Sequence, residues 1–296
     1  MEKLHLGIIG MSEGNGHPYS WSAIFNGYNA DIMASCPFPI IPNYLNERDF
    51  PHDFLTEKGT VTHIYTQDPS ISKHVAKASK INNIVEDPED LIGKVDAILL
   101  ARDDAENHYK FAKYFLRAGI PIFIDKPIAT SIDSLEKIYS EMLYNNQIFT
   151  CSALRYSSEI KLNDNELNQI GNIKIIEANS PKYWKTYGIH LIEPIIVNFP
   201  NKGELISVKR KIKNNKHEVL IIWKNLKARI TMHGKEKHPI SFNYIGERMK
   251  IKKFFTESFM PFRISLENFI NIVNGKGNII PFNEIKEIVK IINLGK

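Results

Sequence analysis

Cysteine, long apolar runs and strong charge of either sign are scarce in this sequence of 296 residues, and each scarcity excludes a class of protein. Cys36 and Cys151 lie far apart and form no C-x-x-C motif, so they provide neither a disulfide scaffold nor a metal site, and they suit a reducing compartment. No run of about 18 apolar residues occurs, and the N-terminus lacks the apolar stretch of a signal peptide. We therefore expect a cytoplasmic protein with no membrane partner.

The charge balance is also modest, since 38 basic and 33 acidic residues give a net charge of +5. The one local basic cluster, Lys209-Arg210-Lys211-Ile212-Lys213, alternates as a strand does, which favours a solvated sheet face over a nucleic-acid-binding stripe. We expect no nucleic-acid partner. The small surplus of basic residues favours anionic ligands such as a dinucleotide or a sugar nucleotide. The length suits two domains, because single cores stop growing beyond roughly 250 residues.

Strands and helices alternate in the first half of the chain. Apolar strands are predicted at 4–9, 61–65, 95–100, 121–124 and 148–153, between helical patterns at 20–28, 71–78, 105–118 and 132–144 and a helical turn at 87–91. The strands are continuously apolar, which predicts a parallel sheet covered on both faces. The fold class is therefore α/β, with an N-terminal Rossmann-type doubly wound domain over residues 1–127.

Residues 31–60 interrupt this alternation of strands and helices. Pro37, Pro39, Pro42 and Pro51, mixed with aromatic residues, predict an irregular segment that is too long for an ordinary connection inside a βαβ unit. We interpret the segment as an insertion in the first domain, and a functional flap is one hypothesis for its role.

The second half changes character. Alternating, β-branched runs at 173–178, 205–212, 218–223, 228–232 and 240–245 predict a mainly antiparallel open sheet, with helical patterns at 188–197, 261–273 and 282–292. We assign residues 128–296 to a second α/β domain that binds substrate and forms oligomers. One alternative has the C-terminal helices pack back on the first domain.

The loop after the first strand is a candidate phosphate-binding loop, because backbone amides at a helix N-terminus can hold a pyrophosphate. Its glycines are spaced G-x-x-x-G-x-G, whereas the dinucleotide fingerprint is G-x-G-x-x-G, and a serine stands where the second glycine would be. A plain glycine-rich turn is the alternative, but the position at the first strand-to-helix junction favours cofactor binding. The predicted cofactor-binding residues of this loop are Gly10, Ser12, Gly14, Asn15 and Gly16.

The acid that grips the ribose in a dinucleotide site is expected at the end of the second strand. Thr66 occupies that position, and Asp68 follows two residues later. Asp68 is a candidate for the ribose contact, while a role in a turn or at a helix N-terminus is equally open. The choice between NAD and NADP therefore stays open.

A strand that ends in Asp125-Lys126-Pro127 is the strongest local signal in the sequence. Open α/β sheets bind ligands at the carboxyl ends of their strands, so Lys126 is expected to project into the cofactor cleft. A lysine there can hydrogen-bond the reacting hydroxyl and share its proton. A surface turn is the alternative.

His190 and Glu193 lie one turn apart at the start of an otherwise apolar helix. A lone histidine on an apolar helix is usually a core residue, but together with Lys126 it becomes a candidate general base, because imidazole titrates near neutral pH. We expect Arg155, Tyr187, His190 and Glu193 to bind substrate together with Lys126.

These segments together resemble the Gfo/Idh/MocA family of oxidoreductases, named for glucose-fructose oxidoreductase and inositol dehydrogenase. The resemblance covers most of the chain, with residues 31–60 outside it. Asn107 and His108 match the family's Asn-His pair at the start of a helix, and Asp125-Lys126-Pro127 matches its E-K-P motif with aspartate in place of glutamate. By this resemblance Asn107, His108, Asp125, Lys126 and Pro127 belong to the cofactor site.

The resemblance also implies roles for single residues. Lys126 would be the catalytic and substrate-binding lysine, His190 the catalytic histidine, and Glu193 the acid that often follows it. Many members carry an aspartate four residues before this histidine, and here Thr186 stands there, which cannot supply a carboxylate to orient the imidazole. Tyr187 or Glu193 are the candidates to compensate. Family members use the open sheet of the second domain to form dimers or tetramers.

Together these features predict an NAD(P)-dependent dehydrogenase or reductase that transfers a hydride between a nicotinamide cofactor and a sugar, cyclitol or nucleotide-linked sugar. Ser12, Thr66 and Thr186 each differ from the residue expected at that place in the site. These differences motivate one alternative, a non-catalytic dinucleotide- or sugar-binding protein. Another alternative is an enzyme that uses NAD as a transient redox cofactor. A homo-dimer or homo-tetramer without a bound metal is expected.

Overall fold

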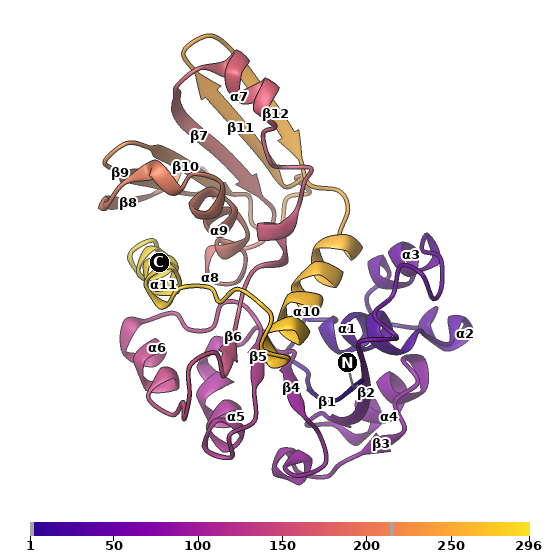
Figure 1. The fold of residues 1–296 in the computed structure, drawn as a ribbon. Coiled ribbons are helices and arrows are strands. Elements are labelled where there is room, and N and C mark those ends of the chain that lie inside the picture. The colour runs from indigo at the N-terminus through magenta and orange to yellow at the C-terminus, as the bar shows by residue number, and fades with distance from the viewer. Residues whose placement is uncertain (1–2, 214–215) are drawn as a thin grey trace. The chain divides into compact units, whose positions relative to one another are not determined.

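The computed structural model describes residues 3–213 and 216–296, which divide into two compact units (Figure 1). The first unit comprises Met1–Ala129, Asp133–Cys151 and Phe262–Ile280, and the second comprises Thr130–Ile132, Ser152–Pro261 and Pro281–Lys296. The chain first leaves the first unit close to the expected boundary at residues 127 and 128, but two later segments return to it. Over the described residues, no helix has the length and apolarity needed to cross a membrane.

The first unit contains a six-stranded parallel sheet in the order β3-β2-β1-β4-β5-β6. Its strands are β1 (Leu4–Ile9), β2 (Gly59–Tyr65), β3 (Asn83–Ile84), β4 (Ala97–Leu100), β5 (Ile122–Ile124) and β6 (Ile148–Phe149). Every residue of β4 is buried, because helices cover both faces of the sheet (Figure 1). The doubly wound class is confirmed, and the strand order reverses between β1 and β4, where open α/β sheets bind ligands.

Seven helices and one 3-10 turn flank this sheet in sequence order: α1 (His17–Asn26), α2 (Ala30–Met33), α3 (Ile40–Asn46), α4 (Pro69–Ala78), η1 (Pro88–Leu91), α5 (Ala105–Arg117), α6 (Ile132–Tyr139) and α10 (Phe259–Val273). Helix α1 starts before the predicted position 20, because Pro18 fits the first helical turn, where its missing N–H leaves no bond unmade. Trp21 of α1 stacks on Phe123 of β5 at a centroid distance of 4.7 Å, and Phe269 of α10 lies 5.7 Å from the same ring. Most of α10 therefore packs on the core of the first unit.

The prediction that residues 31–60 are irregular was wrong at residues 31–33, 40–46 and 59–60, while most of the segment forms turns and bends. It contains α3 and most of α2, and Pro39 and Pro42 lie at the start of α3, where proline is tolerated. A Cβ on Gly16 would lie 2.5 Å from Ile41 Cδ1 and 2.7 Å from the Phe38 ring. The apolar side chains of the segment therefore pack on the glycine loop, and this contact orders them.

The second unit contains a six-stranded sheet in the order β12-β11-β7-β10-β9-β8, in which β7 and β10 are parallel and the other described neighbours are antiparallel. Its strands are β7 (Ile173–Ser180), β8 (Leu205–Lys213), β9 (Lys216–Trp223), β10 (Lys227–Met232), β11 (Ser241–Gly246) and β12 (Lys250–Phe254). Lys209, Arg210 and Lys211 are exposed on β8, as a solvated sheet face requires, while the side chain of Lys213 lies outside the described part.

Short helices cover the apolar face of this sheet: α7 (Asp164–Ile170), α8 (Trp184–Tyr187), α9 (Ile189–Asn198) and α11 (Phe282–Leu294), with 3-10 turns η2 (Ala153–Tyr156) and η3 (Pro200–Lys202). Alternate residues of the strands, such as Ile176, Val219 and Ile230, are buried with Ile192 of α9 and Ile291 of α11 in one core. This core fixes α9, and with it the side chains predicted to bind substrate.

Candidate active site

The loop between β1 and α1 has the backbone properties of an anion-binding loop. Gly14 has a φ of +76° and open space around it, whereas a Cβ on Gly10 would lie 2.4 Å from Pro18 Cγ, so the two glycines are needed for different reasons. Some backbone N–H groups of the loop donate no hydrogen bond within the described chain, namely those of Ser12, Glu13, Gly14 and Gly16. These donors fit the oxygens of a phosphate at the start of α1.

Ser12, which stands in place of the second fingerprint glycine, joins this loop to the loop that follows β4. Its hydroxyl donates to Asp103 Oδ1 at 2.6 Å, and the backbone N–H of Asp103 donates to Ser12 Oγ at 3.1 Å. The other carboxylate oxygen of Asp103 lies 3.6 Å from Nζ of Lys126, which is 4% exposed. The loops after β1, β4 and β5 therefore meet at one edge of the sheet.

Asp125 is a buried anion beside this lysine. Its Oδ2 accepts a hydrogen bond from Asn15 Nδ2 at 2.8 Å and lies 2.7 Å from His17 Nδ1, while its Oδ1 accepts the backbone N–H of Lys126 at 2.7 Å. Burial raises the pKa of Asp125, but the charges of His17 and Lys126 and these hydrogen bonds outweigh it and hold the pKa well below its usual range. Asp125 thus fixes the backbone from which Lys126 projects.

A second network closes the start of the glycine loop. The amide of Gln67 pairs with the backbone of Met11 through hydrogen bonds of 2.9 and 2.6 Å. Arg102 donates to Gln67 at 3.0 Å and to both oxygens of Asp104, which also accepts from Asn107 Nδ2 at 2.6 Å. Burial raises the pKa of Asp104, but the bonds from Arg102 and Asn107 lower it overall. The predicted residue Asn107 therefore supports the loop after β4.

His108 is fully buried and connects two loops. Its Nδ1 lies 2.9 Å from the carbonyl oxygen of Ile128, beyond Pro127, and its Nε2 lies 2.7 Å from the carbonyl oxygen of Arg102. These contacts join the loop after β4 to the loop after β5. His108 is therefore placed to hold these loops in position.

Asp68 caps helix α4. Its Oδ1 accepts hydrogen bonds from the backbone N–H and the hydroxyl of Ser70, and these bonds lower the pKa of Asp68. The hydroxyl of Thr66 donates to the carbonyl of Asp68 at 2.7 Å, so it is used within the turn. The helix N-terminal role that the sequence left open is observed, and the ribose contact stays a prediction.

The second unit brings together four predicted substrate-binding residues around α9. Ser152 Oγ lies 2.7 Å from Nδ1 of His190, and the Ser152 backbone N–H donates to Glu193 Oε2 at 2.7 Å. Arg155 donates to Glu193 Oε1 at 2.6 Å and to Glu284 Oε1 at 2.7 Å. Burial raises the pKa of Glu193, against the influence of Arg155.

Tyr187 is the fourth member of this cluster. Its ring packs edge-on to His190 at a centroid distance of 4.9 Å, and its hydroxyl accepts from Lys182 Nζ at 2.7 Å. Thr186, which stands where many family members carry the aspartate, donates instead to the carbonyl of Tyr183 at 3.5 Å. Ser152, which the sequence did not indicate, contacts the Nδ1 of His190.

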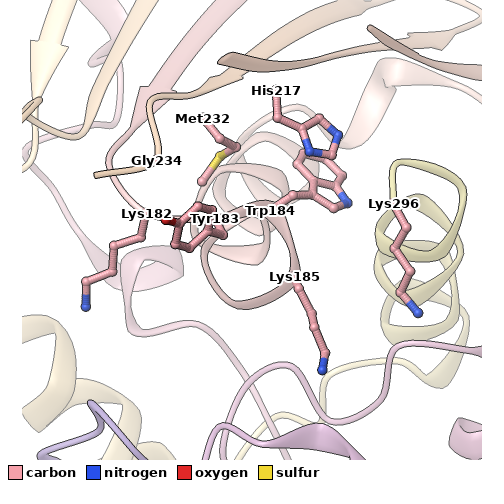
Figure 2. A pocket seen from close by; sticks show the side chains of 8 residues that line it. All are labelled: Lys182, Tyr183, Trp184, Lys185, His217, Met232, Gly234 and Lys296. Atoms are coloured by element: carbon pink, nitrogen blue, oxygen red, sulfur yellow. The ribbon is translucent and has the colours of Figure 1, made fainter. Parts of the chain in front are cut away.

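A pocket of about 300 Å³ opens beside α8 in the second unit (Figure 2). Three of its lining side chains are lysines and none is a carboxylate, so its positive field favours anionic groups. Lys182 is shared between this pocket and the contact with Tyr187. The lining residues are Lys182, Tyr183, Trp184, Lys185, His217, Met232, Gly234 and Lys296.

The sequence did not indicate several polar residues of the site, among them Asp103, His17, Ser152 and Glu284. Asp103 directly follows the strand at 97–100, so the rule that ligands bind at the carboxyl ends of strands could have identified it. His17 follows the glycine loop and offered a weaker signal of the same kind. Ser152 and Glu284 had none, because 38 residues separate Ser152 from His190 and no motif spacing relates them.

Comparison with known proteins shows a family resemblance over part of the chain. Residues 41–151 match a family model described as an oxidoreductase family with an NAD-binding Rossmann fold, GFO_IDH_MocA. This segment resembles the Gfo/Idh/MocA family, so the predicted resemblance is confirmed there. The match indicates a dehydrogenase or reductase with an NAD-binding Rossmann domain. The expectation that residues 31–60 lie outside the family was wrong from residue 41 onward, because the match begins there.

Solved structures share the fold over nearly the whole of this chain. The myo-inositol dehydrogenase of Lactobacillus casei in complex with NAD(H) and myo-inositol is 13% identical, with a TM-score of 0.73 and coverage of 99% of this chain and 93% of that chain. The biliverdin reductase of Synechocystis sp. PCC 6803 in complex with biliverdin and NADP+ is 12% identical, with a TM-score of 0.70 and coverage of 99% and 98%. At these identities the likeness shows the fold. No curated protein matches the sequence.

Proposed function

We propose that this protein is an NAD(P)-dependent oxidoreductase that transfers a hydride between the nicotinamide and a sugar, cyclitol or nucleotide-linked sugar. The observation that carries the proposal is the placement of Lys126. It is buried at the carboxyl end of β5, 3.6 Å from Asp103, and Ser12 connects Asp103 to the glycine loop. This is the edge of the sheet at which open α/β folds bind dinucleotides.

The glycine loop would hold the pyrophosphate of the cofactor. The N–H groups of Ser12, Glu13, Gly14 and Gly16 supply unused donors there, and Gly10 allows the close approach of strand and helix. Asn15 and Asp125 hold the loop against β5. In this proposal Asn107, His108 and Pro127 support the site by fixing its loops, and Asp68 would turn its carboxylate toward the ribose.

The hydride transfer is chemistry that the bound nicotinamide supplies. The protein would contribute the handling of the substrate oxygen, with Lys126 binding and polarising it and His190 moving the proton. Glu193, on the helix face that His190 shares, forms a partly buried ion pair with Arg155, and Tyr187 packs on the ring of His190. The inositol dehydrogenase and biliverdin reductase of the same fold show that this architecture serves more than one substrate class.

The first test replaces Lys126 with alanine. We expect kcat/KM for an active sugar or cyclitol to fall by about 10²- to 10⁴-fold, the range that a positioned acid or base supplies, with far-ultraviolet circular dichroism unchanged. Lys73→Ala, at an exposed position of α4, is the matched control and should keep full turnover. Unchanged turnover in the Lys126 variant would contradict the proposal.

The same assay separates the two alternatives. A binding protein would retain NADH or a sugar without turning over any member of a sugar and sugar-nucleotide panel. An enzyme with a transient redox cofactor would convert its substrate without a net change in nicotinamide absorbance. The proposed dehydrogenase changes that absorbance in proportion to product formed.

A homo-dimer or homo-tetramer in the cytoplasm completes the proposal. The face of the second-unit sheet that points away from its core carries the ion pair between Arg229 and Glu177 at 2.6 Å, with Leu220 and Asn243 in neighbouring register positions. Broad open sheets are usually covered, and a second copy is the simplest cover. Light scattering coupled to size exclusion tests this, and a monomer at all concentrations would contradict it.

A further inference from the structure

Ser152 contacts Nδ1 of His190, the ring nitrogen to which an orienting carboxylate would bind. Its Oγ lies 2.7 Å from His190 Nδ1, and the residue is fully buried. Ser152 also caps η2, where its Oγ accepts the backbone N–H of Leu154 at 3.3 Å. A hydroxyl that is closed off from solvent by this packing cannot reach a substrate, so Ser152 acts on the reaction only through His190.

Helix α9 fixes the serine from two directions. His190 and Glu193 lie three residues apart and therefore share a face of the helix. The first contacts the hydroxyl of Ser152, and the second accepts its backbone N–H at 2.7 Å. Arg155 in turn holds Glu193 at 2.6 Å and is itself held by Glu284. The serine hydroxyl therefore has little freedom to leave the imidazole.

The direction in which the Ser152 hydroxyl donates its hydrogen determines which ring nitrogen of His190 is protonated. A serine hydroxyl can donate one hydrogen bond, and a buried donor left without an acceptor is costly. Among the described contacts of Ser152 Oγ, the N–H of Leu154 is a donor, so Nδ1 of His190 is the acceptor that the hydroxyl can use. A neutral imidazole whose Nδ1 accepts a hydrogen bond carries its own hydrogen on Nε2.

We propose that Ser152 is a positioning residue that sets the tautomer of His190, so that the neutral ring presents an N–H at Nε2 toward the substrate. The inference rests on the proposed function of His190 at the substrate oxygen. A carboxylate can only accept, so an aspartate partner would hold the hydrogen on Nδ1 and leave Nε2 bare as a base. Serine at this place gives the opposite tautomer.

The consequence is a preference for carbonyl substrates. A neutral Nε2–H donates a hydrogen bond to a carbonyl oxygen and polarises it, as a neutral imidazole does in other enzymes. Hydride transfer to the polarised carbonyl leaves an alkoxide, and the ammonium group of Lys126 would supply its proton, because a neutral ring that gave up its Nε2 hydrogen would be left as an imidazolate. In this arrangement Lys126 supplies the proton and His190 the hydrogen bond, and the site is suited to bind the ketone or aldehyde form of its sugar or cyclitol.

The tautomer can be read directly in the full-length protein. Long-range ¹H–¹⁵N correlation spectra of protein labelled with ¹⁵N-histidine distinguish a protonated from an unprotonated ring nitrogen, and His190→Gln assigns the signal. We expect His190 to carry its hydrogen on Nε2 at a pH where the ring is neutral. Ser152→Ala should release this state into a mixture of tautomers, and Ser152→Thr, which keeps the hydroxyl, should restore it.

A matched control separates positioning from stability. Asn163 caps α7 in the same unit through a hydrogen bond to the N–H of Glu166 at 2.9 Å, so Asn163→Ala removes a cap without touching His190. It should leave the His190 signals unchanged. A wild-type spectrum with the hydrogen on Nδ1, or a Ser152→Ala spectrum identical to the wild type, overturns the proposal.

Kinetics give the second measurement. Ser152→Ala should lower kcat/KM for carbonyl reduction by about 10- to 100-fold, a part of what acid–base residues supply, and Ser152→Thr should recover most of it. If the wild-type protein turns over no sugar or cyclitol, the proposed function fails, while the spectra still decide whether Ser152 sets the ring. If turnover is found and the Ser152→Ala spectra match the wild type, only the assignment of Ser152 fails.

Discussion

His17 lies between Asp125 and an aromatic stack: its Nδ1 is 2.7 Å from Asp125 Oδ2, and its ring is 4.8 Å from the ring of Trp21. Phe262 packs edge-on to the same imidazole at 5.1 Å. The histidine is thus held at the start of α1 by packing while it holds the carboxylate next to Lys126. This partly buried contact connects the core of the first unit to the residue next to Lys126, on which the proposed chemistry depends.

Asp125→Asn tests the weight of this contact in the fold. The amide keeps the shape of the side chain but removes the charge that His17 and Lys126 face. We expect the free energy of unfolding to fall by about 3 kcal/mol, as when one partner of a buried ion pair is removed. Urea denaturation near neutral pH measures it. Asp133→Asn, at an exposed position of α6, should change it by less than about 0.5 kcal/mol, and equal effects would contradict the account.

The pH dependence of the unfolding free energy also tests the contribution of the Asp125 carboxylate. The pKa of Asp125 is lowered in the folded protein from an ordinary value of 3.8, so its contribution to stability is present above that pH and is lost as the pH falls below it. The difference in unfolding free energy between the wild type and Asp125→Asn should therefore stay constant above about pH 5 and shrink below about pH 4. A difference that stays constant into the acid range would show that Asp125 has an ordinary pKa.

Gly16→Ala tests whether residues 38–41 pack on the glycine loop. The new Cβ would lie 2.5 Å from Ile41 Cδ1, so we expect a loss of about 1 to 3 kcal/mol, which is typical of an overpacked core. Adding Ile41→Ala should recover part of the loss contributed by this clash, so the two substitutions should be less than additive in a double-mutant cycle. Full additivity would mean that the two side chains do not meet.

Asp68 has a capping role and a proposed cofactor role, which two substitutions separate. Asp68→Ala removes the cap of α4 and should cost about 1 kcal/mol of unfolding free energy, whereas Asp68→Ser keeps a capping oxygen and should cost only a few tenths. Both variants lack the carboxylate, so both should bind NADH about tenfold more weakly. Unchanged affinity in Asp68→Ser would remove Asp68 from the cofactor site and leave it as a helix cap.

The Rossmann half of the fold could be predicted because its strands are buried on both faces and are therefore continuously apolar. Edges of sheets gave weaker signals. The two residues of β3 are both exposed, and three of the five residues of β12, an edge strand, are lysines, so both strands were missed. The strand expected at 148–153 ends at Phe149, because Ser152 there begins η2 as its cap.

The residues of the candidate site that stand in recognisable sequence motifs could be predicted. Lys126 and His190 each stand in a recognisable segment, and the structure places each beside polar partners. Their partners could not be predicted, because the contacts of Asp103 with Ser12 and of Ser152 with His190 join residues 91 and 38 positions apart. Such pairs arise only when strands and helices that are separate in sequence pack together.

Dinucleotide binding is the most direct test of the central claim. Titration of the full-length protein with NADH and with NADPH, followed by quenching of tryptophan fluorescence and by calorimetry, should give saturable binding of at least one of them with a Kd in the range of about 1 μM to 1 mM. The affinity should fall in a Gly14→Ala variant, whose loop backbone is strained. If neither dinucleotide binds the wild-type protein, the proposal of an NAD(P)-dependent oxidoreductase is contradicted, and a sugar-binding protein becomes the better explanation.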